Sequence, residues 1–187
     1  KDGSGSSGSD QASVSNIVLS AGSGGTTGFE GAVCNSVFYD CVSLKSATLG
    51  DKVTSLGNDA FRGCRSLQEI VIPNSVKSVG TYCFYGCTGL INVVVGDGVT
   101  TINNYAFQGC LALKKVTIPE TVTTMGGYAF ADCDNLRIVT IPSSMSVVSA
   151  GAFKNCNKLE KVEFEEGSCL ERIVDYVFNG CTLLSRI

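Results

Sequence analysis

One period of 23 residues dominates this sequence. Phenylalanine occurs at six positions spaced by this interval and at a seventh position 25 residues later: Phe38, Phe61, Phe84, Phe107, Phe130, Phe153 and Phe178. A Cys follows each Phe by three residues, and a Leu follows each Cys by three residues. A fixed period of this length is the signature of a repeat protein, in which each unit buries its apolar face only by stacking on its neighbours. We therefore expect a solenoid.

The second half of each repeat predicts a β-strand. After the Leu, two alternate positions of the repeat are always apolar, as in Leu67-x-x-Ile70-x-Ile72, and a period of two is typical of a strand. A shorter apolar pair follows, such as Val76 and Val79, and marks the returning side of the coil. A proline has no N–H to donate to a ladder and ends a strand. All three prolines directly follow the alternating pair: Pro73, Pro119 and Pro142.

The same pattern sets the expected limits of the solenoid. Val14-x-x-Ile17-x-Leu19 repeats the strand pattern, so residues 13–187 are predicted to form the solenoid, with residues 13–37 as a degenerate first rung. The predicted strands begin at eight positions: Val14, Leu44, Leu67, Leu90, Leu113, Leu136, Leu159 and Leu184. Residues 1–12 are predicted to be a flexible Gly/Ser-rich tail, and residues 21–28 a bulging loop. Because the eighth motif has no polar cap, we expect more chain or a partner to cover it.

The repeat L-x-x-V-x-I-P-x-x-V-x-x-I-G-x-x-A-F-x-x-C resembles the BspA-type, or Treponema pallidum-type, leucine-rich repeat over residues 13–187. Departures are Cys83 and Val177 in place of Ala, and a two-residue insertion near residues 165–170. The resemblance implies an α/β repeat fold: a right-handed leucine-rich-repeat solenoid with a concave parallel β-sheet and about eight rungs of 23 residues. It also implies a protein that is secreted or at the cell surface and that binds rather than catalyses.

Composition argues against several classes of function. The chain has no His and no Trp, so it lacks the commonest general base and metal ligand, and we predict no enzyme activity and no cofactor. A net charge of −3 gives no field that would draw the chain to nucleic acid. No run of 18 apolar residues occurs, so direct membrane insertion is not expected.

The ten cysteines have two readings. A Cys at a fixed repeat position is most simply a small buried apolar residue with a weak S–H donor. Disulfides are the alternative, and Cys34, Cys83 and Cys169, which lie off the ladder, are the better candidates for them. Zinc is not expected, because there is neither a His nor a C-x-x-C pair, and no other metal site is predicted.

The candidate binding residues are those between the Leu and the strand residues that point inward, because alternate strand side chains must face outward. The middle outward column is Thr48, Val71, Val94, Thr117, Thr140 and Glu163. The flanking columns are Lys45, Gln68, Ile91, Lys114, Arg137 and Glu160, and Ser46, Glu69, Asn92, Lys115, Ile138 and Lys161. Three of these form a basic cluster, Lys114, Lys115 and Arg137. The next rung is acidic, with Glu160, Glu163, Glu165 and Glu166. This asymmetry of charge along the sheet could set the register of a bound partner. Except for Ser46, the residues of the three columns are our predicted protein-binding residues.

We therefore expect a non-catalytic protein–protein interaction module that binds a protein partner through the concave face, in an adhesive or scaffolding role. The alternative is a structural subunit packed permanently into a larger multi-protein assembly. A secreted or cell-surface location is implied by the resemblance alone, and an organelle lumen or an intracellular assembly is the alternative.

Overall fold

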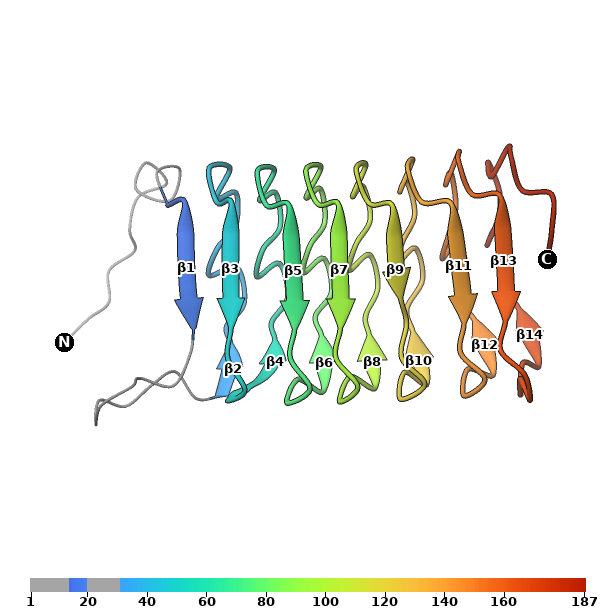
Figure 1. The fold of residues 1–187 in the computed structure, drawn as a ribbon, viewed down its shortest axis with the longest axis horizontal. Helices are drawn as coiled ribbons and strands as arrows, with labels where there is room; N and C mark the ends of the chain where they lie inside the picture. The colour runs from blue at the N-terminus through green and yellow to red at the C-terminus, as the bar shows by residue number, and fades with distance from the viewer. Residues whose placement is uncertain (1–13, 20–30) are drawn as a thin grey trace.

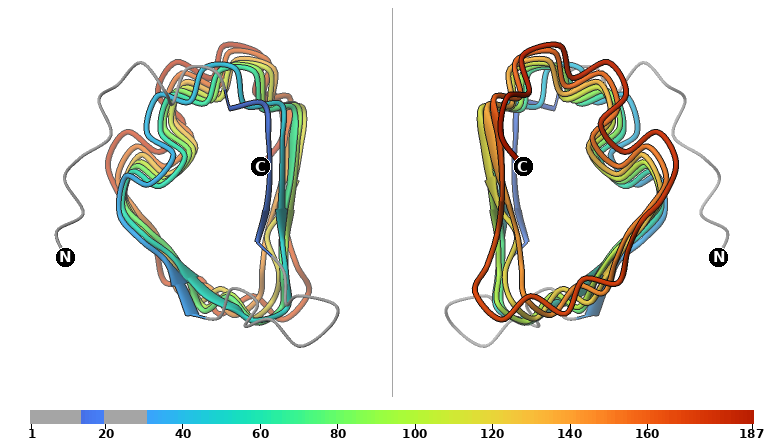
Figure 2. Two further views of the ribbon diagram at one scale, coloured as in Figure 1. Left: turned by 90° about the vertical axis from the view of Figure 1, so that its left-hand side faces the viewer. Right: turned by 90° about the vertical axis from the view of Figure 1, so that its right-hand side faces the viewer.

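The computed structural model describes residues 14–19 and 31–187. The predicted tail and the predicted loop at residues 21–28 lie outside these residues. The chain winds into a coil whose turns stack side by side along one axis (Figure 1). Seen end-on, each turn has one straight wall, an inclined opposite wall and a folded third side, and successive turns superimpose (Figure 2).

The straight wall is a seven-stranded parallel sheet. Its strands, in spatial order, are β1 (Asn16–Leu19), β3 (Ser46–Leu49), β5 (Glu69–Ile72), β7 (Asn92–Val95), β9 (Lys115–Thr117), β11 (Ile138–Ile141) and β13 (Lys161–Phe164). From β3 to β13, neighbouring strands pair residues that lie one repeat apart, as Ile70 pairs with Val93. The first rung was predicted from Ile17 and Leu19, and here β1 pairs these residues with Ala47 and Leu49 of β3.

The inclined wall holds shorter parallel strands. Five form one sheet, in the order β10 (Thr124–Met125), β8 (Thr101–Ile102), β6 (Ser78–Val79), β4 (Val53–Leu56) and β2 (Gly31–Val33). A separate pair is formed by β12 (Val147–Val148) and β14 (Arg172–Ile173). The chain is therefore a parallel β-solenoid of about six turns, from β3–β4 to β13–β14.

Two parts of the predicted fold need correction. The eighth strand, expected after Leu184, is reduced to one bridge between Lys161 and Arg186, so eight rungs are not formed. The α/β expectation is also wrong, because the described residues contain no helix. The reason lies around each Phe. The residue two before it and the residue two after it adopt positive φ, as Tyr105 (φ 60°) and Gly109 (φ 73°) do around Phe107. Two left-handed residues four positions apart prevent a helical turn.

The core is a set of ladders inside the coil. The seven Phe rings stack on one another with centroids 5.1–6.0 Å apart. The five from Phe61 to Phe153 are fully buried, and burying one such side chain stabilises the fold by about 1.5–3 kcal/mol. No polar or charged side chain of the described residues is buried. Neighbouring turns therefore share one continuous apolar interior.

The ladder cysteines behave as the simpler reading predicted. From Cys64 onward each ladder thiol donates its S–H to the backbone carbonyl of a Phe one turn earlier, at 3.1–3.4 Å. All ten thiols are free, so the disulfide alternative is wrong. Of its candidates, Cys83 is fully buried beside Phe84, whereas Cys34 and Cys169 are exposed. Burial raises the pKa of the Cys64 thiol to about 12.

The ladders of the main sheet differ in length, and the three that lead into a rung with a proline are the shorter ones. Pro73, Pro119 and Pro142 follow β5, β9 and β11. These strands pair with the strand of the preceding rung over two, three and one residues respectively. No proline follows β3, β7 or β13. Each of these strands pairs with the preceding strand, β1, β5 or β11, over four residues. At two of these, Gly50 and Glu165 donate an N–H to the preceding rung, and a proline cannot make this bond. The sheet is therefore most open between β9 and β11.

The two-residue insertion leaves the stack intact. It is absorbed in a turn after β13, and β14 still pairs in parallel with β12, Val147 with Arg172. Phe178 consequently stacks on Phe153, at 6.0 Å. The insertion changes the chain length between two rungs without shifting the core positions.

Candidate functional site

The structure brings the predicted binding residues onto one surface, the outward side of the seven-stranded sheet, which we call the sheet face. All 17 are exposed or half-buried. Alternation along the strands produces this arrangement, as in β5, where Ile70 and Ile72 are buried while Glu69 and Val71 are exposed. Residues with the same place in the repeat form columns across the strands because the rungs stack in register.

An apolar stripe runs along the sheet face. Val71 is 59% exposed and Val94, its neighbour on β7, is 46% exposed. Ile91 and Ile138 add apolar area in the flanking columns. Val18 of β1 is 67% exposed and pairs with Thr48 in the middle column, although it was not among the predicted residues. Carrying the outward column back into the first rung would have identified it.

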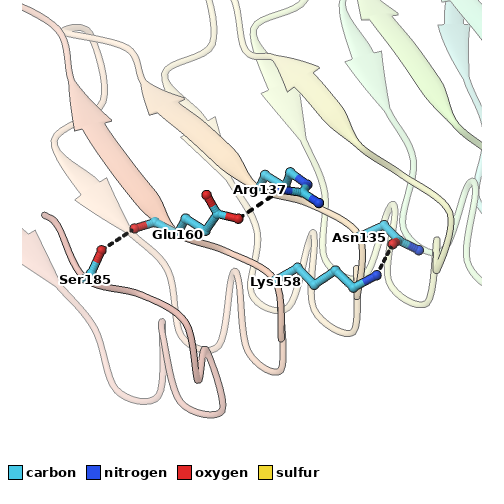
Figure 3. A network of polar contacts seen from close by, with 5 residues as sticks. All are labelled: Asn135, Arg137, Lys158, Glu160 and Ser185. Atoms are coloured by element: carbon cyan, nitrogen blue, oxygen red, sulfur yellow. Dashed lines mark hydrogen bonds and ion pairs between the residues drawn. The ribbon is translucent and has the colours of Figure 1, made fainter.

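Much of the predicted charge asymmetry is cancelled by ion pairs between and within rungs. Arg137 Nη1 lies 3.0 Å from Glu160 Oε1 on the next rung (Figure 3). Lys161 pairs with Glu163, and this lysine lowers the pKa of the Glu163 carboxyl by its hydrogen bond and its charge. Two carboxylates of the acidic rung, Glu160 and Glu163, are thus paired within the chain, whereas Glu165 and Glu166 make no ion pair with the described residues.

The rungs are also tied together along the turn that precedes the sheet. Lys158 Nζ donates to Asn135 Oδ1 at 2.8 Å, and the Ser185 hydroxyl donates to the Glu160 carbonyl at 3.3 Å (Figure 3). These bonds join residues 23 and 25 positions apart, so they repeat the stacking of the rungs. They hold the charged end of the sheet face in place.

A hollow of about 550 Å³ lies where the ladder is most open, between β9 and β11. Its lining combines basic, apolar and acidic residues: Lys114, Lys115, Val116, Thr117, Ile118, Arg137, Ile138, Thr140, Glu163 and Glu165. The predicted basic cluster is therefore brought together here. Within the described ranges, Lys114 and Lys115 have no carboxylate partner, whereas Arg137 has one.

A second cluster, away from the sheet face, escaped the sequence reasoning. The Arg62 guanidinium lies 4.9–5.5 Å from the ring centroids of Tyr39, Tyr82 and Tyr85 and pairs with Asp59 at 2.9 Å. The hydrogen bond to Asp59 is the main cause that raises the Arg62 pKa. The cation is already matched by the chain's own rings and carboxylate, so this cluster is structural. The available signal was the repeat position of these residues, since Tyr39, Arg62 and Tyr85 each directly follow a ladder Phe.

The described residues show no grouping typical of a metal centre. No three His, Cys, Asp or Glu residues among them are grouped so as to hold a metal ion. Within the same ranges, no helix has the length and apolar character needed to cross a membrane. The sheet face with its hollow is therefore the candidate site.

The repeat of this solenoid is also found in known proteins. A family model described as the BspA type leucine-rich repeat region, in six copies, matches residues 32–160 and 100–187. No curated protein matches the chain.

Solved structures show the same coil. A leucine-rich repeat protein from Bacteroides ovatus is 32% identical, with a TM-score of 0.80, and the match covers 91% of this chain and 45% of that one. The T. pallidum leucine-rich repeat protein is 30% identical, with a TM-score of 0.78, covering 91% and 78%. The pneumococcal vaccine antigen PcpA, at 19% identity and a TM-score of 0.62 over 92% and 50%, shares the fold. This chain thus spans less than half of the Bacteroides protein. The chain belongs to the BspA-type leucine-rich repeat family.

Proposed function

We propose that this chain is a non-catalytic module that binds a protein partner through the sheet face, in an adhesive or scaffolding role. One observation supports the proposal above the others. The sheet face carries an exposed apolar stripe, including Val71 and Val94, between columns of charged residues. Aligned apolar area with a polar rim is the composition of a protein–protein interface.

The construction of the fold favours the same role. All apolar ladder positions are used inside the coil, whereas the outward columns differ from rung to rung. The core therefore provides a rigid platform, and the outward residues can vary without loss of stability. Such a division suits a binding surface built on a repeat scaffold.

The test is a capture experiment with matched variants. Val71→Arg and Val94→Arg each place a charge on the apolar stripe, and Thr54→Arg and Thr124→Arg place the same charge on the opposite wall. All four positions are exposed, so each change is expected to alter stability by less than about 0.5 kcal/mol. Proteins captured from lysate and medium of the source organism are quantified for wild type and variants, and binding is repeated with the purified partner.

We expect the partner to be retained by wild type and by the opposite-wall variants and lost with the stripe variants. If all variants retain the same proteins in fixed stoichiometry, the sheet face is not the binding surface. The structural-subunit alternative would then replace this proposal, and melting that depends on protein concentration would support it.

We also propose a secreted or cell-surface location, in keeping with the family resemblance; an organelle lumen or an intracellular assembly is the alternative. Antibody labelling of intact cells, compared with permeabilised cells, tests the location. Label that requires permeabilisation would contradict it.

A further inference from the structure

The hollow between β9 and β11 differs from the rest of the sheet face in three respects. The ladder there has a single residue pair, Lys115 with Ile138, whereas the ladders on either side have three and four. The depression is set into the sheet at this opening. Ile138, 47% exposed, gives it an apolar wall.

The net unmatched charge in this hollow is positive, with two lysines against one carboxylate. Arg137 is paired with Glu160, and Glu163 with Lys161, so these four charges largely cancel. Glu165 keeps its negative charge, because it makes no ion pair with the described residues and its Oε2 accepts only a hydrogen bond from the Ser143 amide, at 3.4 Å. Lys114 and Lys115 are exposed and, within the described part of the chain, have no ion-pair partner. A ligand that brings negative charge would complete the pairing.

The shape of the site indicates an extended segment. Residues of β9, β11 and β13 line the hollow. It opens onto the sheet face, where each strand contributes one residue to every outward column. In an extended chain, alternate side chains point to the same side, so an acidic and an apolar residue two positions apart would both face the sheet. The acidic side chain would meet the lysines while the apolar one contacts Ile138.

We propose that the hollow is a specificity site for an extended, acidic segment of the partner protein, in which acidic and apolar residues occur at alternate positions. The proposal rests on the function proposed above, because it names the partner chemistry that part of the sheet face selects. Lys114 and Lys115 are the selecting charges, and Ile138 provides the apolar contact. The Arg137–Glu160 pair holds the wall of the site.

The probe is the peptide SESVSESVS with a fluorescent label, compared with versions carrying Gln, or Lys, in place of both Glu residues. The protein variants are Lys114→Gln with Lys115→Gln, and a control, Lys52→Gln with Lys77→Gln, that makes the same change in net charge at exposed positions away from the sheet face. Affinity is measured by fluorescence anisotropy at low and high salt. Amide chemical-shift changes on titration with the peptide report the location.

We expect the acidic peptide to bind wild type and the control, and to lose about five- to tenfold in affinity with the Lys114→Gln, Lys115→Gln variant, as expected for two exposed ion pairs. Affinity should fall with salt, since the charges are exposed. Shifts should concentrate in residues 114–118 and 137–140. Equal loss in the control, equal binding of the Gln peptide, or shifts elsewhere would overturn the proposal.

Failure of this inference is distinguishable from failure of the proposed function. A natural partner that is lost with Val71→Arg but unaffected by the Lys114→Gln, Lys115→Gln variant would leave sheet-face binding intact and refute the acidic specificity. Peptide binding that maps to the hollow, together with a natural partner that ignores every sheet-face variant, would do the opposite.

Discussion

Removal of one ring from the centre of the Phe ladder should cost more stability than removal from its end. Phe107 is fully buried and stacks on Phe84 and on Phe130, with centroids 5.1 Å away on both sides. Phe178 is half-buried and has one stacking neighbour, Phe153, at 6.0 Å. The two residues are the same in chemistry and differ in burial and in neighbours.

The magnitude follows from these environments. Phe107→Ala removes a fully buried ring and leaves a cavity between two rigid neighbours, which typically costs about 3–5 kcal/mol. Each stacked pair adds about 0.5–1.5 kcal/mol beyond burial, so the loss of two pairs favours the upper half of that range. Phe178→Ala loses one pair and only part of the burial, and we expect about 2 kcal/mol.

The assay is equilibrium unfolding in urea, followed by far-ultraviolet circular dichroism and by tyrosine fluorescence, since the chain has six Tyr and no Trp. Coincident transitions and an unchanged m-value would show that the coil still unfolds as one unit. Two separate transitions in Phe107→Ala alone would show that the central ring couples the two halves. If Phe107→Ala costs no more than Phe178→Ala, stacking and burial along the ladder are not the source of stability.

Three further predictions concern the thiols and the prolines. Burial raises the Cys64 pKa from 9.0 to about 12, so above pH 9 the native state keeps a proton that the unfolded chain releases. The free energy of unfolding should therefore fall above pH 9 by about 1.4 kcal/mol per pH unit for this thiol. Unfolding measured between about pH 8 and pH 10 should show a smaller loss in Cys64→Ala than in wild type. A thiol reagent at neutral pH should modify the exposed Cys34 and Cys169 first, and mass spectrometry that finds a fully buried ladder thiol modified as fast would contradict the packing. Pro142→Ala supplies an N–H that can donate to the Ile118 carbonyl. Hydrogen exchange should therefore detect a protected amide at position 142. Fast exchange at this amide would show that the proline does not limit the β9–β11 ladder.

Most of the scaffold could be predicted from the period alone. Residues one repeat apart must stack, which places Phe107 on Phe84 and pairs β5 with β7. Alternation then assigns Ile70 inward and Val71 outward without any knowledge of the fold. These predictions succeed because the ladder positions are apolar in nearly every rung, so local pattern and tertiary packing agree.

The expected helices failed because the decisive information is backbone conformation. The residue two after each Phe is Gly, Asn or Asp in every rung, and these types tolerate the left-handed region, so half of the turn was readable. The residue two before it is often Tyr, as at Tyr82 and Tyr105, where φ is 56° and 60°. Tyrosine has no preference for this conformation, and only the stacked rings of successive rungs, 4.8 Å apart for this pair, show what stabilises it there.

The site was predictable in its residues and not in its electrostatics. Arg137 and Glu160 lie 23 positions apart, so the repeat itself makes them neighbours, and their ion pair could have been inferred from the register. Lys161 and Glu163 sit two apart on one strand and therefore face the same side. Counting charges by rung missed both pairs, because a net count does not show which charges already have partners.

The role of Pro142 at the hollow can be recognised only once the stacking of the rungs is known. Read alone, Pro142 marks the end of a strand. In the coil it also cannot donate the hydrogen bond that Glu165 donates one rung later, and the ladder into its rung has one pair. The hollow lies at this opening, beside the two lysines that the ion pairs leave unmatched. A proline that directly follows β11 and two lysines in the preceding rung thus lie at one site, because stacking at a fixed period brings them together.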